Sequence, residues 1–247
     1  MKLKAPECVF SSANFCPGCG HGLASRLIGE VAEELGIVEK VIGVVDVACC
    51  SFHIDYWNFD TIMSAHGRDL PTAVGAKHIR PDCAVFAYLG DGAAYSIGMA
   101  ETVHAATRNE NIPVLFVKNA IYGMTGGQMA PTSLPGQVTQ TSPYGRDVAT
   151  VGYPIRVSEM LAALDAPTYI QRVAVNNVKH VKEAEKAILK AFRNQVEGRG
   201  FSLIEVISSC PTNWGMTPEA ALRWVEEKMI PYYPLGVYKD QTEEGTR

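Results

Sequence analysis

The chain has 247 residues, a formal net charge of −4 and 47% apolar residues. A chain of this size and composition can bury a large core, and its acidic balance argues against a nucleic-acid-binding surface. No apolar run approaches the length of a membrane span, and residues 1–6 lack the apolar core of a signal peptide. We therefore expect one compact α/β domain over residues 1–247, located in the cytoplasm, with neither nucleic-acid nor membrane partners.

The first motif along the chain is the segment Cys-Pro-Gly-Cys, which contains Cys16 and Cys19. A turn with Pro and Gly can point two thiolates at one metal ion or cluster, although zinc sites and redox dithiols share this spacing. The chain has seven cysteines in all. In a cytoplasmic protein we expect them to be metal ligands or reduced thiols rather than a disulfide framework.

An apolar run over residues 41–45 then predicts a buried strand, which leads into Cys49, Cys50 and Ser51. Farther on, the segment Ala-His-Gly-Arg at residues 65–68 precedes a predicted helix over residues 72–78. An arginine near a helix start can bind phosphate, and a histidine beside it can hydrogen-bond to the same group. A solvated loop is the alternative interpretation of this segment.

The centre of the chain predicts a strand–helix–strand unit. Residues 84–89 and 113–117 are apolar runs typical of buried strands, and the stretch between them has helical spacing. Two strands joined in this way are parallel, so their carboxyl ends face one edge of the sheet. This edge is where open α/β sheets bind ligands.

Asp91 and Asn119 directly follow these two strands. Their carboxylate and amide oxygens are hard ligands suited to Mg²⁺, which shares its coordination sphere with phosphates, and a backbone carbonyl just past Asn119 is a natural third ligand. The flanking Gly90 and Gly92 let a phosphate approach bare backbone at a helix start. The pattern therefore predicts a metal-bound diphosphate at this sheet edge.

The rest of the chain continues the same architecture. A long loop without periodicity, residues 121–148, is expected to wrap the cofactor and meet a partner subunit. Further strands are predicted over residues 169–173 and 201–207, the second of which ends near Cys210, and further helices over residues 158–164 and 181–196. If all strands share one parallel sheet, the cysteines at strand ends gather at the edge that carries Asp91.

Gly90-Asp91-Gly92 followed by Asn119 resembles the thiamine diphosphate motif. The string Asn-Ala-Ile-Tyr-Gly-Met-Thr-Gly-Gly-Gln at residues 119–128 is similar to that of the β subunit of the 2-oxoacid:ferredoxin oxidoreductases, and the resemblance extends from about residue 15 to about residue 210. It implies a parallel-sheet thiamine diphosphate-binding fold with helices on both faces. An irregular, aromatic C-terminal extension is expected from about residue 211.

The resemblance also implies ligands. Asp91 and Asn119 would bind Mg²⁺ through their side chains, and Ile121 through its carbonyl. A [4Fe–4S] cluster would be held by Cys16, Cys19, Cys50 and Cys210, where Cys50 is preferred to Cys49 because it directly precedes Ser51. A four-thiolate zinc site is the rival interpretation of these cysteines. The other expected cofactor contacts are Cys49, Ser51, His66, Gly67, Arg68, Gly90, Gly92, Ala93, Tyr122, Gly123, Met124 and Thr125.

The implied activity is oxidative decarboxylation of a 2-oxoacid with coenzyme A, which yields an acyl-CoA and CO₂ and reduces ferredoxin. The glutamate that such enzymes place against the aminopyrimidine lies on the α subunit in this family, so no catalytic residue is assigned on this chain. We expect activity only with an α subunit, and further clusters on γ or δ subunits.

The substrate is expected to be the branched-chain acid 3-methyl-2-oxobutanoate, with 2-oxoglutarate as the near rival. No run of basic residues supplies a clamp for a second carboxylate, although Arg68 and Lys118 remain candidates for one. Two other classes stay open. A non-redox thiamine lyase or synthase would leave the cysteines without a role, and a zinc-stabilised interaction subunit would leave the diphosphate motif without one.

Overall fold

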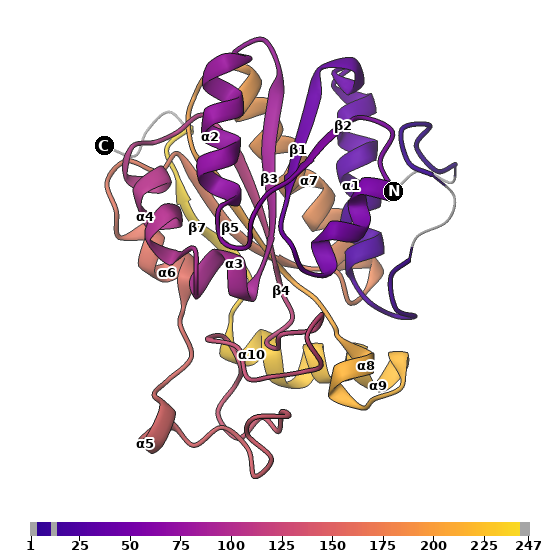
Figure 1. The fold of residues 1–247 in the computed structure, drawn as a ribbon, viewed down its shortest axis with the longest axis vertical. Coiled ribbons are helices and arrows are strands. Elements are labelled where there is room, and N and C mark those ends of the chain that lie inside the picture. Colours follow the sequence, from indigo (N-terminus) through magenta and orange to yellow (C-terminus); the bar gives the residue numbers. More distant parts are fainter. Residues whose placement is uncertain (1–3, 11–13, 243–247) are drawn as a thin grey trace.

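A computed structural model describes residues 4–10 and 14–242. Its centre is a seven-stranded sheet in the order β2-β1-β3-β4-β6-β5-β7 (Figure 1). Neighbouring strands are parallel, except that β7 runs antiparallel to β5. The strands are β1 (Val41–Val45), β2 (Asp60–Met63), β3 (Ala84–Gly90), β4 (Pro113–Lys118), β5 (Tyr169–Ala174), β6 (Ser202–Ile207) and β7 (Gly236–Asp240).

Helices cover both faces of this sheet, as expected (Figure 1). The α-helices are α1 (His21–Glu34), α2 (Asp69–Ile79), α3 (Asp91–Tyr95), α4 (Met99–Thr107), α5 (Val148–Val151), α6 (Val157–Ala162), α7 (Val178–Val196), α8 (Pro211–Trp214), α9 (Pro218–Trp224) and α10 (Ile230–Tyr232). Two short 3-10 helices, η1 (Val38–Lys40) and η2 (Cys49–Asp55), and one π-helix, η3 (Val225–Met229), complete the regular structure of the described residues.

The central strands alternate their side chains between two apolar layers. On β3, Phe86 and Tyr88 pack into the layer covered by α1 and α7, while Val85 and Leu89 pack into the layer covered by α2, α4 and α6. Because both faces are covered, these strands are apolar at nearly every position rather than at every second one. This is why apolar runs alone revealed them in the sequence.

The predicted core elements are confirmed. β1 has the predicted bounds, β3, β4, β5 and β6 differ from theirs by one residue at one end, and β3 pairs in parallel with β4. The extension from residue 211 is more regular than expected, because α8, α9, η3 and α10 follow one another and β7 then joins the sheet. No element among residues 4–10 and 14–242 is a helix long and apolar enough to cross a membrane.

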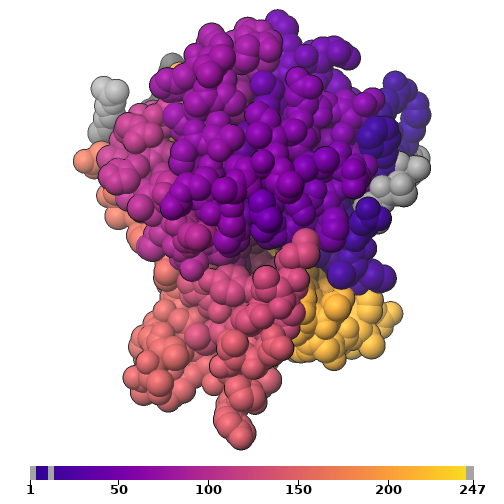
Figure 2. Space-filling model, in the orientation of Figure 1, coloured from indigo at the N-terminus to yellow at the C-terminus, as the bar shows by residue number. Residues whose placement is uncertain are grey.

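Two segments project beyond the carboxyl ends of the strands. One is the arm, residues 121–153, which leaves β4, and the other is the group of C-terminal helices α8 to α10 (Figures 1 and 2). Leu134 of the arm packs with Met229 and Tyr233 of the C-terminal helices against Ala120 and Ile207 at the strand ends. This third apolar cluster fixes both segments to the sheet edge.

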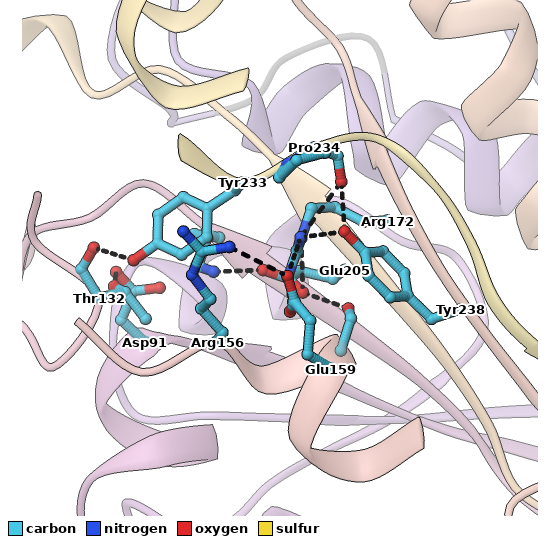
Figure 3. A network of polar contacts seen from close by, with 11 residues as sticks. Asp91, Thr132, Arg156, Glu159, Arg172, Glu205, Tyr233, Pro234 and Tyr238 are labelled. Atoms are coloured by element: carbon cyan, nitrogen blue, oxygen red, sulfur yellow. Dashed lines mark hydrogen bonds and ion pairs between the residues drawn. The ribbon is translucent and has the colours of Figure 1, made fainter. Parts of the chain in front are cut away.

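A buried network of charges crosses the same edge (Figure 3). The Lys118 ammonium on β4 forms an ion pair with Glu205 on β6, and both side chains are completely buried. Arg172 on β5 lies 3.0 Å from the other Glu205 oxygen through Nε and 2.5 Å from Glu159 through Nη2. Burial alone would raise the pKa of Glu205, but Lys118 and Arg172 together lower it, so the carboxylate is charged.

We predict that Glu205→Gln lowers the free energy of unfolding by about 3–5 kcal/mol, because it leaves Lys118 and Arg172 short of a buried counter-charge. Urea denaturation followed by circular dichroism measures this value. The matched control is Glu183→Gln, which breaks an exposed pair with Lys186 at 3.2 Å and is expected to cost less than about 1 kcal/mol. Equal losses in the two variants would show that the buried network contributes nothing special.

Candidate functional site

A cavity of about 330 Å³ lies at the carboxyl edge of the sheet. Its lining contains most of the residues predicted from the sequence as cofactor or metal contacts, namely Cys49, Cys50, His66, Gly90, Asp91, Gly92, Asn119, Ile121, Tyr122, Gly123, Met124 and Thr125. The parallel pairing of β1, β3 and β4 brings their ends together here, as the strand–helix–strand argument requires. His21, Asp46, Val47 and Ala48 also line the cavity.

The turn after β4 has an unusual backbone. Ala120, directly after Asn119, has a φ of 57°, in the left-handed region that a non-glycine residue seldom adopts. Its carbonyl accepts hydrogen bonds from Ser133 Oγ at 2.6 Å and Gln137 Nε2 at 3.0 Å, and the Asn119 side-chain oxygen accepts one from the Ile121 amide at 3.2 Å. The arm therefore holds a strained turn that carries two of the expected ligands.

Asp91 is buried and only half satisfied. Its Oδ2 accepts a hydrogen bond of 2.6 Å from Thr132 Oγ1, while Oδ1 is buried with no hydrogen-bond partner among the described residues. Burial raises the pKa of Asp91 to about 7, which the Thr132 hydroxyl and the Lys118 charge partly oppose. An orphaned buried carboxylate oxygen that faces a cavity is the arrangement a cation ligand needs.

A second carboxylate, Asp46, orients a histidine at the cavity. Asp46 Oδ1 lies 2.6 Å from His66 Nδ1, while Asp46 Oδ2 is buried with no partner among the described residues. The far side of the imidazole lies close to Gly92, where an added Cβ would meet His66 Nε2 at 3.0 Å and Tyr122 Cε1 at 3.2 Å. Only a glycine leaves His66 and Tyr122 undisturbed at this position of the motif.

All seven cysteines are free thiols, and four of them gather beside the cavity. The pKa of Cys19 is raised to about 12, chiefly by burial and in smaller part by the neighbouring Cys210, Cys49 and Cys16. Cys49 and Cys210 both lie close to Gly123, at 3.3 and 3.6 Å from where its Cβ would be. Across residues 4–10 and 14–242, no three His, Cys, Asp or Glu side chains are arranged to hold a metal ion as they stand.

The geometry favours Cys49 over Cys50 as the companion of the other three thiols, which differs from the sequence-based choice. Cys50 is completely buried in the apolar layer with Val45 and Tyr88. Its neighbour Cys49, one position earlier in η2, is only partly buried and lies beside Cys16 and Cys210. The 3-10 helix turns adjacent residues to different sides, and the motif alone did not show which of the two lies beside Cys16 and Cys210.

Four expected cofactor contacts lie outside the cavity lining. Arg68 forms an ion pair of 2.8 Å with Glu101 of α4 and donates a hydrogen bond to the carbonyl of Gly67 at 3.0 Å. Its guanidinium group therefore contacts α4 and its own loop. Gly67 has a φ of 73° and packs so closely on the turn before α4 that a Cβ would overlap it. Ser51 Oγ donates to a carbonyl of its own turn at 2.8 Å, and Ala93 is buried in the core.

Sequence reasoning missed Asp46, Thr132 and Asn213. Asn213 Nδ2 donates to the Gly123 carbonyl at 3.0 Å and contacts Cys210 Sγ at 3.4 Å. Asp46 had a detectable signal, since it is a carboxylate directly after a predicted buried strand. Thr132 and Asn213 lie in segments without periodicity, where no pattern marks a polar residue as buried.

One protein family matches this chain over residues 46–206, and its description is thiamine pyrophosphate enzyme, C-terminal TPP binding domain. Thiamine pyrophosphate and thiamine diphosphate are the same cofactor. The matched region contains β2 to β5, all but the last residue of β6, and every metal-ligand position expected for Mg²⁺.

Among similar proteins, the ketoisovalerate oxidoreductase subunit VorA of Methanothermobacter thermautotrophicus is 42% identical over 95% of this chain and 49% of its own length. The 2-oxoglutarate synthase subunit KorB of Methanocaldococcus jannaschii is 34% identical over 93% of this chain and 82% of its own length. The chain thus spans about half the length of the ketoisovalerate relatives that it matches.

The 2-oxoglutarate:ferredoxin oxidoreductase from Magnetococcus marinus, solved with 2-oxoglutarate, coenzyme A and succinyl-CoA bound, has a similar structure. The TM-score is 0.77 at 24% sequence identity, with 98% of this chain and 87% of that chain covered. This similarity confirms the predicted fold class.

We predict that Asp46→Asn makes the fold more stable than the wild type at pH 8. Burial raises the pKa of Asp46 above its ordinary range near 3.8, so at high pH the folded state must hold a buried charge that Asn lacks. Each unit of raised pKa corresponds to about 1.4 kcal/mol. The advantage is expected to disappear as the pH falls towards 4, where the wild-type carboxyl becomes neutral, and urea titrations across this range measure it.

Asp82→Asn is the control with the opposite sign. Its exposed carboxyl accepts hydrogen bonds from Arg80, which lower the pKa of Asp82 to about 2. The wild type should therefore be the more stable of this pair above about pH 4, and the difference should fade as the pH falls towards 2. A pH-independent effect of Asp46→Asn would show that its carboxylate carries no burial cost.

Proposed function

Because this chain belongs to the β subunits of the 2-oxoacid:ferredoxin oxidoreductases, within the thiamine pyrophosphate enzymes, we propose that it binds Mg²⁺–thiamine diphosphate at the Asp91 cavity and passes electrons to a cluster held by its cysteines. The single observation that carries this proposal is the meeting of Asp91, Asn119 and four free thiols at one sheet edge. The reaction proposed is CoA-dependent oxidative decarboxylation of a 2-oxoacid, coupled to reduction of ferredoxin.

The residues at the cavity fit a magnesium-bound diphosphate. The orphaned Asp91 Oδ1, the Asn119 side chain and the Ile121 carbonyl would supply three oxygen ligands, which is the donor set that Mg²⁺ prefers. Bare backbone at Gly90 leaves open space within 4 Å for a phosphate to approach. When bound, thiamine diphosphate would supply the electron sink for decarboxylation. His66, held by Asp46 and close to Gly92, would contact the cofactor as well.

The thiol set proposed for a [4Fe–4S] cluster is Cys16, Cys19, Cys49 and Cys210. It draws its support from the location of Cys49 beside Cys210 and Gly123, and from the complete burial of Cys50 in the apolar layer with Val45 and Tyr88. Asn213 would donate a hydrogen bond to Cys210 Sγ, the kind of contact that tunes the reduction potential of a cluster.

We predict that Cys49→Ser removes the cluster and Cys50→Ser keeps it. The two positions are adjacent and the substitutions identical, so each variant is the matched control for the other. Iron and sulfide analysis with electron paramagnetic resonance of dithionite-reduced, anaerobically purified protein measures the outcome. Loss in Cys50→Ser alone would restore the sequence-based choice, and a colourless wild type that contains zinc would overturn the cluster proposal.

The substrate proposed is a branched-chain 2-oxoacid such as 3-methyl-2-oxobutanoate. A second substrate carboxylate needs a cation, but Lys118 is buried in an ion pair with Glu205, and Arg68 forms an ion pair with Glu101. In the part of the chain that the structure describes, the cavity is lined by no Lys or Arg, while Val47, Ile121 and Met124 contribute apolar surface. This composition suits an aliphatic side chain better than a carboxylate.

We predict that the complex containing this chain reduces ferredoxin faster with 3-methyl-2-oxobutanoate than with 2-oxoglutarate. One missing buried cation typically separates a charged from an apolar substrate by tenfold or more in kcat/KM. Ferredoxin reduction under anaerobic conditions, with each acid and with CoA present or omitted, measures the ratio. A preference for 2-oxoglutarate would refute the substrate, and release of CO₂ without ferredoxin reduction would favour a non-redox thiamine enzyme.

The proposed partners are an α subunit that completes the cofactor site, γ or δ subunits with further clusters, and ferredoxin. The proposed location is the cytoplasm. The arm supports a partner contact, because Val138, Tyr144 and Tyr153 expose 63%, 100% and 72% of their surface on it. Large apolar side chains that are exposed together favour contact with another protein.

A further inference from the structure

We propose that the arm positions the two side-chain ligands for magnesium, Asp91 and Asn119, through two consecutive residues, Thr132 and Ser133. Thr132 holds one oxygen of Asp91, so that only the other is offered to the cation, and Ser133 holds the turn that carries Asn119. This inference rests on the proposed function, since it takes Asp91 and Asn119 to be cation ligands. Thr132 and Ser133 are positioning residues, because neither lines the cavity.

The contact to Asp91 is buried and directional. Thr132 Oγ1 donates to Asp91 Oδ2 at 2.6 Å, and the two residues are 0% and 3% exposed. Asp91 Oδ1 has no hydrogen-bond partner among the described residues. One carboxylate oxygen is therefore committed to the protein and the other is left for a ligand, which favours binding of the cation through a single oxygen.

The contact to the Asn119 turn comes from the next residue. Ser133 Oγ donates to the Ala120 carbonyl at 2.6 Å, where the backbone has the left-handed φ of 57°. Such a conformation persists only where surrounding contacts enforce it. Thr132 and Ser133 thus act on the ends of two different strands, β3 and β4, from one point of the arm.

The C-terminal segment in turn fixes Thr132. Tyr233 donates its hydroxyl hydrogen to the Thr132 carbonyl at 2.7 Å (Figure 3). The Lys118 ammonium lies 3.3 Å from the centre of the Tyr233 ring. Lys118 is itself held by Glu205. The chain of contacts from Glu205 to Asp91 therefore consists of buried groups that have little freedom to rearrange.

Magnesium makes such positioning important. It demands near-octahedral oxygen ligands at about 2.0–2.1 Å, so a carboxylate that rotates or binds through both oxygens loses affinity. Removal of the group that orients a metal ligand typically reduces metal affinity by about 10–100-fold. The methyl group that valine has in place of the threonine hydroxyl cannot donate a hydrogen bond to Asp91, whereas the serine hydroxyl can.

The experiment compares Thr132→Val with Thr132→Ser, each in the complex in which the protein occurs. Quenching of tryptophan fluorescence by thiamine diphosphate is titrated with Mg²⁺, and thermal unfolding is followed without cofactors. We expect Thr132→Val to raise the Mg²⁺ concentration for half-saturation by about 10–100-fold, and Thr132→Ser to stay near the wild type. Thr150→Val is the matched control, because Thr150 makes a similar 2.7 Å bond to Asp147 on the exposed part of the arm.

The outcomes separate this inference from the proposed function. A wild type that fails to bind Mg²⁺–thiamine diphosphate refutes the proposed function, whatever the variants do. A wild type that binds, together with a Thr132→Val variant that has an unchanged Mg²⁺ requirement, overturns the inference alone. The same holds if Thr132→Val only lowers the unfolding temperature, because that result would give Thr132 a merely structural role.

Discussion

The rule that a buried charge needs a partner governs the carboxyl edge of this sheet. Lys118, Arg172 and Glu205 project from three adjacent strands, and their side chains are fully buried. They pair with one another and with Glu159, and Ser158, Pro234 and Tyr238 supply further hydrogen bonds. Such a network is weak evidence for stability, since well-packed apolar residues often do as well. It is stronger evidence for geometry, because each member is useful only in one arrangement. The strands, α6 and the C-terminal segment are thereby held in one register around Asp91.

The proposed cofactor cavity lies at the edge whose geometry this network fixes. Asp91 and Asn119 come from two strand ends and Asp46 comes from a third. The arm closes over Asp91 and the Asn119 turn through hydrogen bonds in addition to the apolar packing of Leu134. Two buried carboxylate oxygens, on Asp46 and Asp91, have no partner among the described residues. Unsatisfied buried groups destabilise a fold, and both of these residues line the cavity, where a bound ligand could satisfy them.

The sequence predicted the elements whose physics is local. Strands buried on both faces appear as apolar runs, and parallel connection rules then place Asp91 and Asn119 at one edge. What it did not reveal depends on tertiary contacts. Whether Cys49 or Cys50 lies beside Cys16 and Cys210 depends on how η2 turns, Arg68 pairs with Glu101 of α4, and Thr132 lies in an aperiodic arm. The regular C-terminal segment was missed because its helices are short and are followed by a strand that pairs with β5, a contact between distant parts of the chain that no local pattern shows.

The same rule also determines what the cavity can recognise. Among the described residues, the cations nearest the cavity are already engaged: Lys118 by Glu205, Arg68 by Glu101, and Arg146 by the carbonyls of the arm. A substrate carboxylate at the far end of a 2-oxoacid would meet no Lys or Arg side chain in the cavity lining that the structure describes, and Lys118 could pair with it only by giving up part of its ion pair with Glu205. An aliphatic group needs only the apolar lining. A preference for a branched-chain substrate would thus follow from the pairing of these Lys and Arg side chains within the fold, and would need no separate specificity pocket among the described residues.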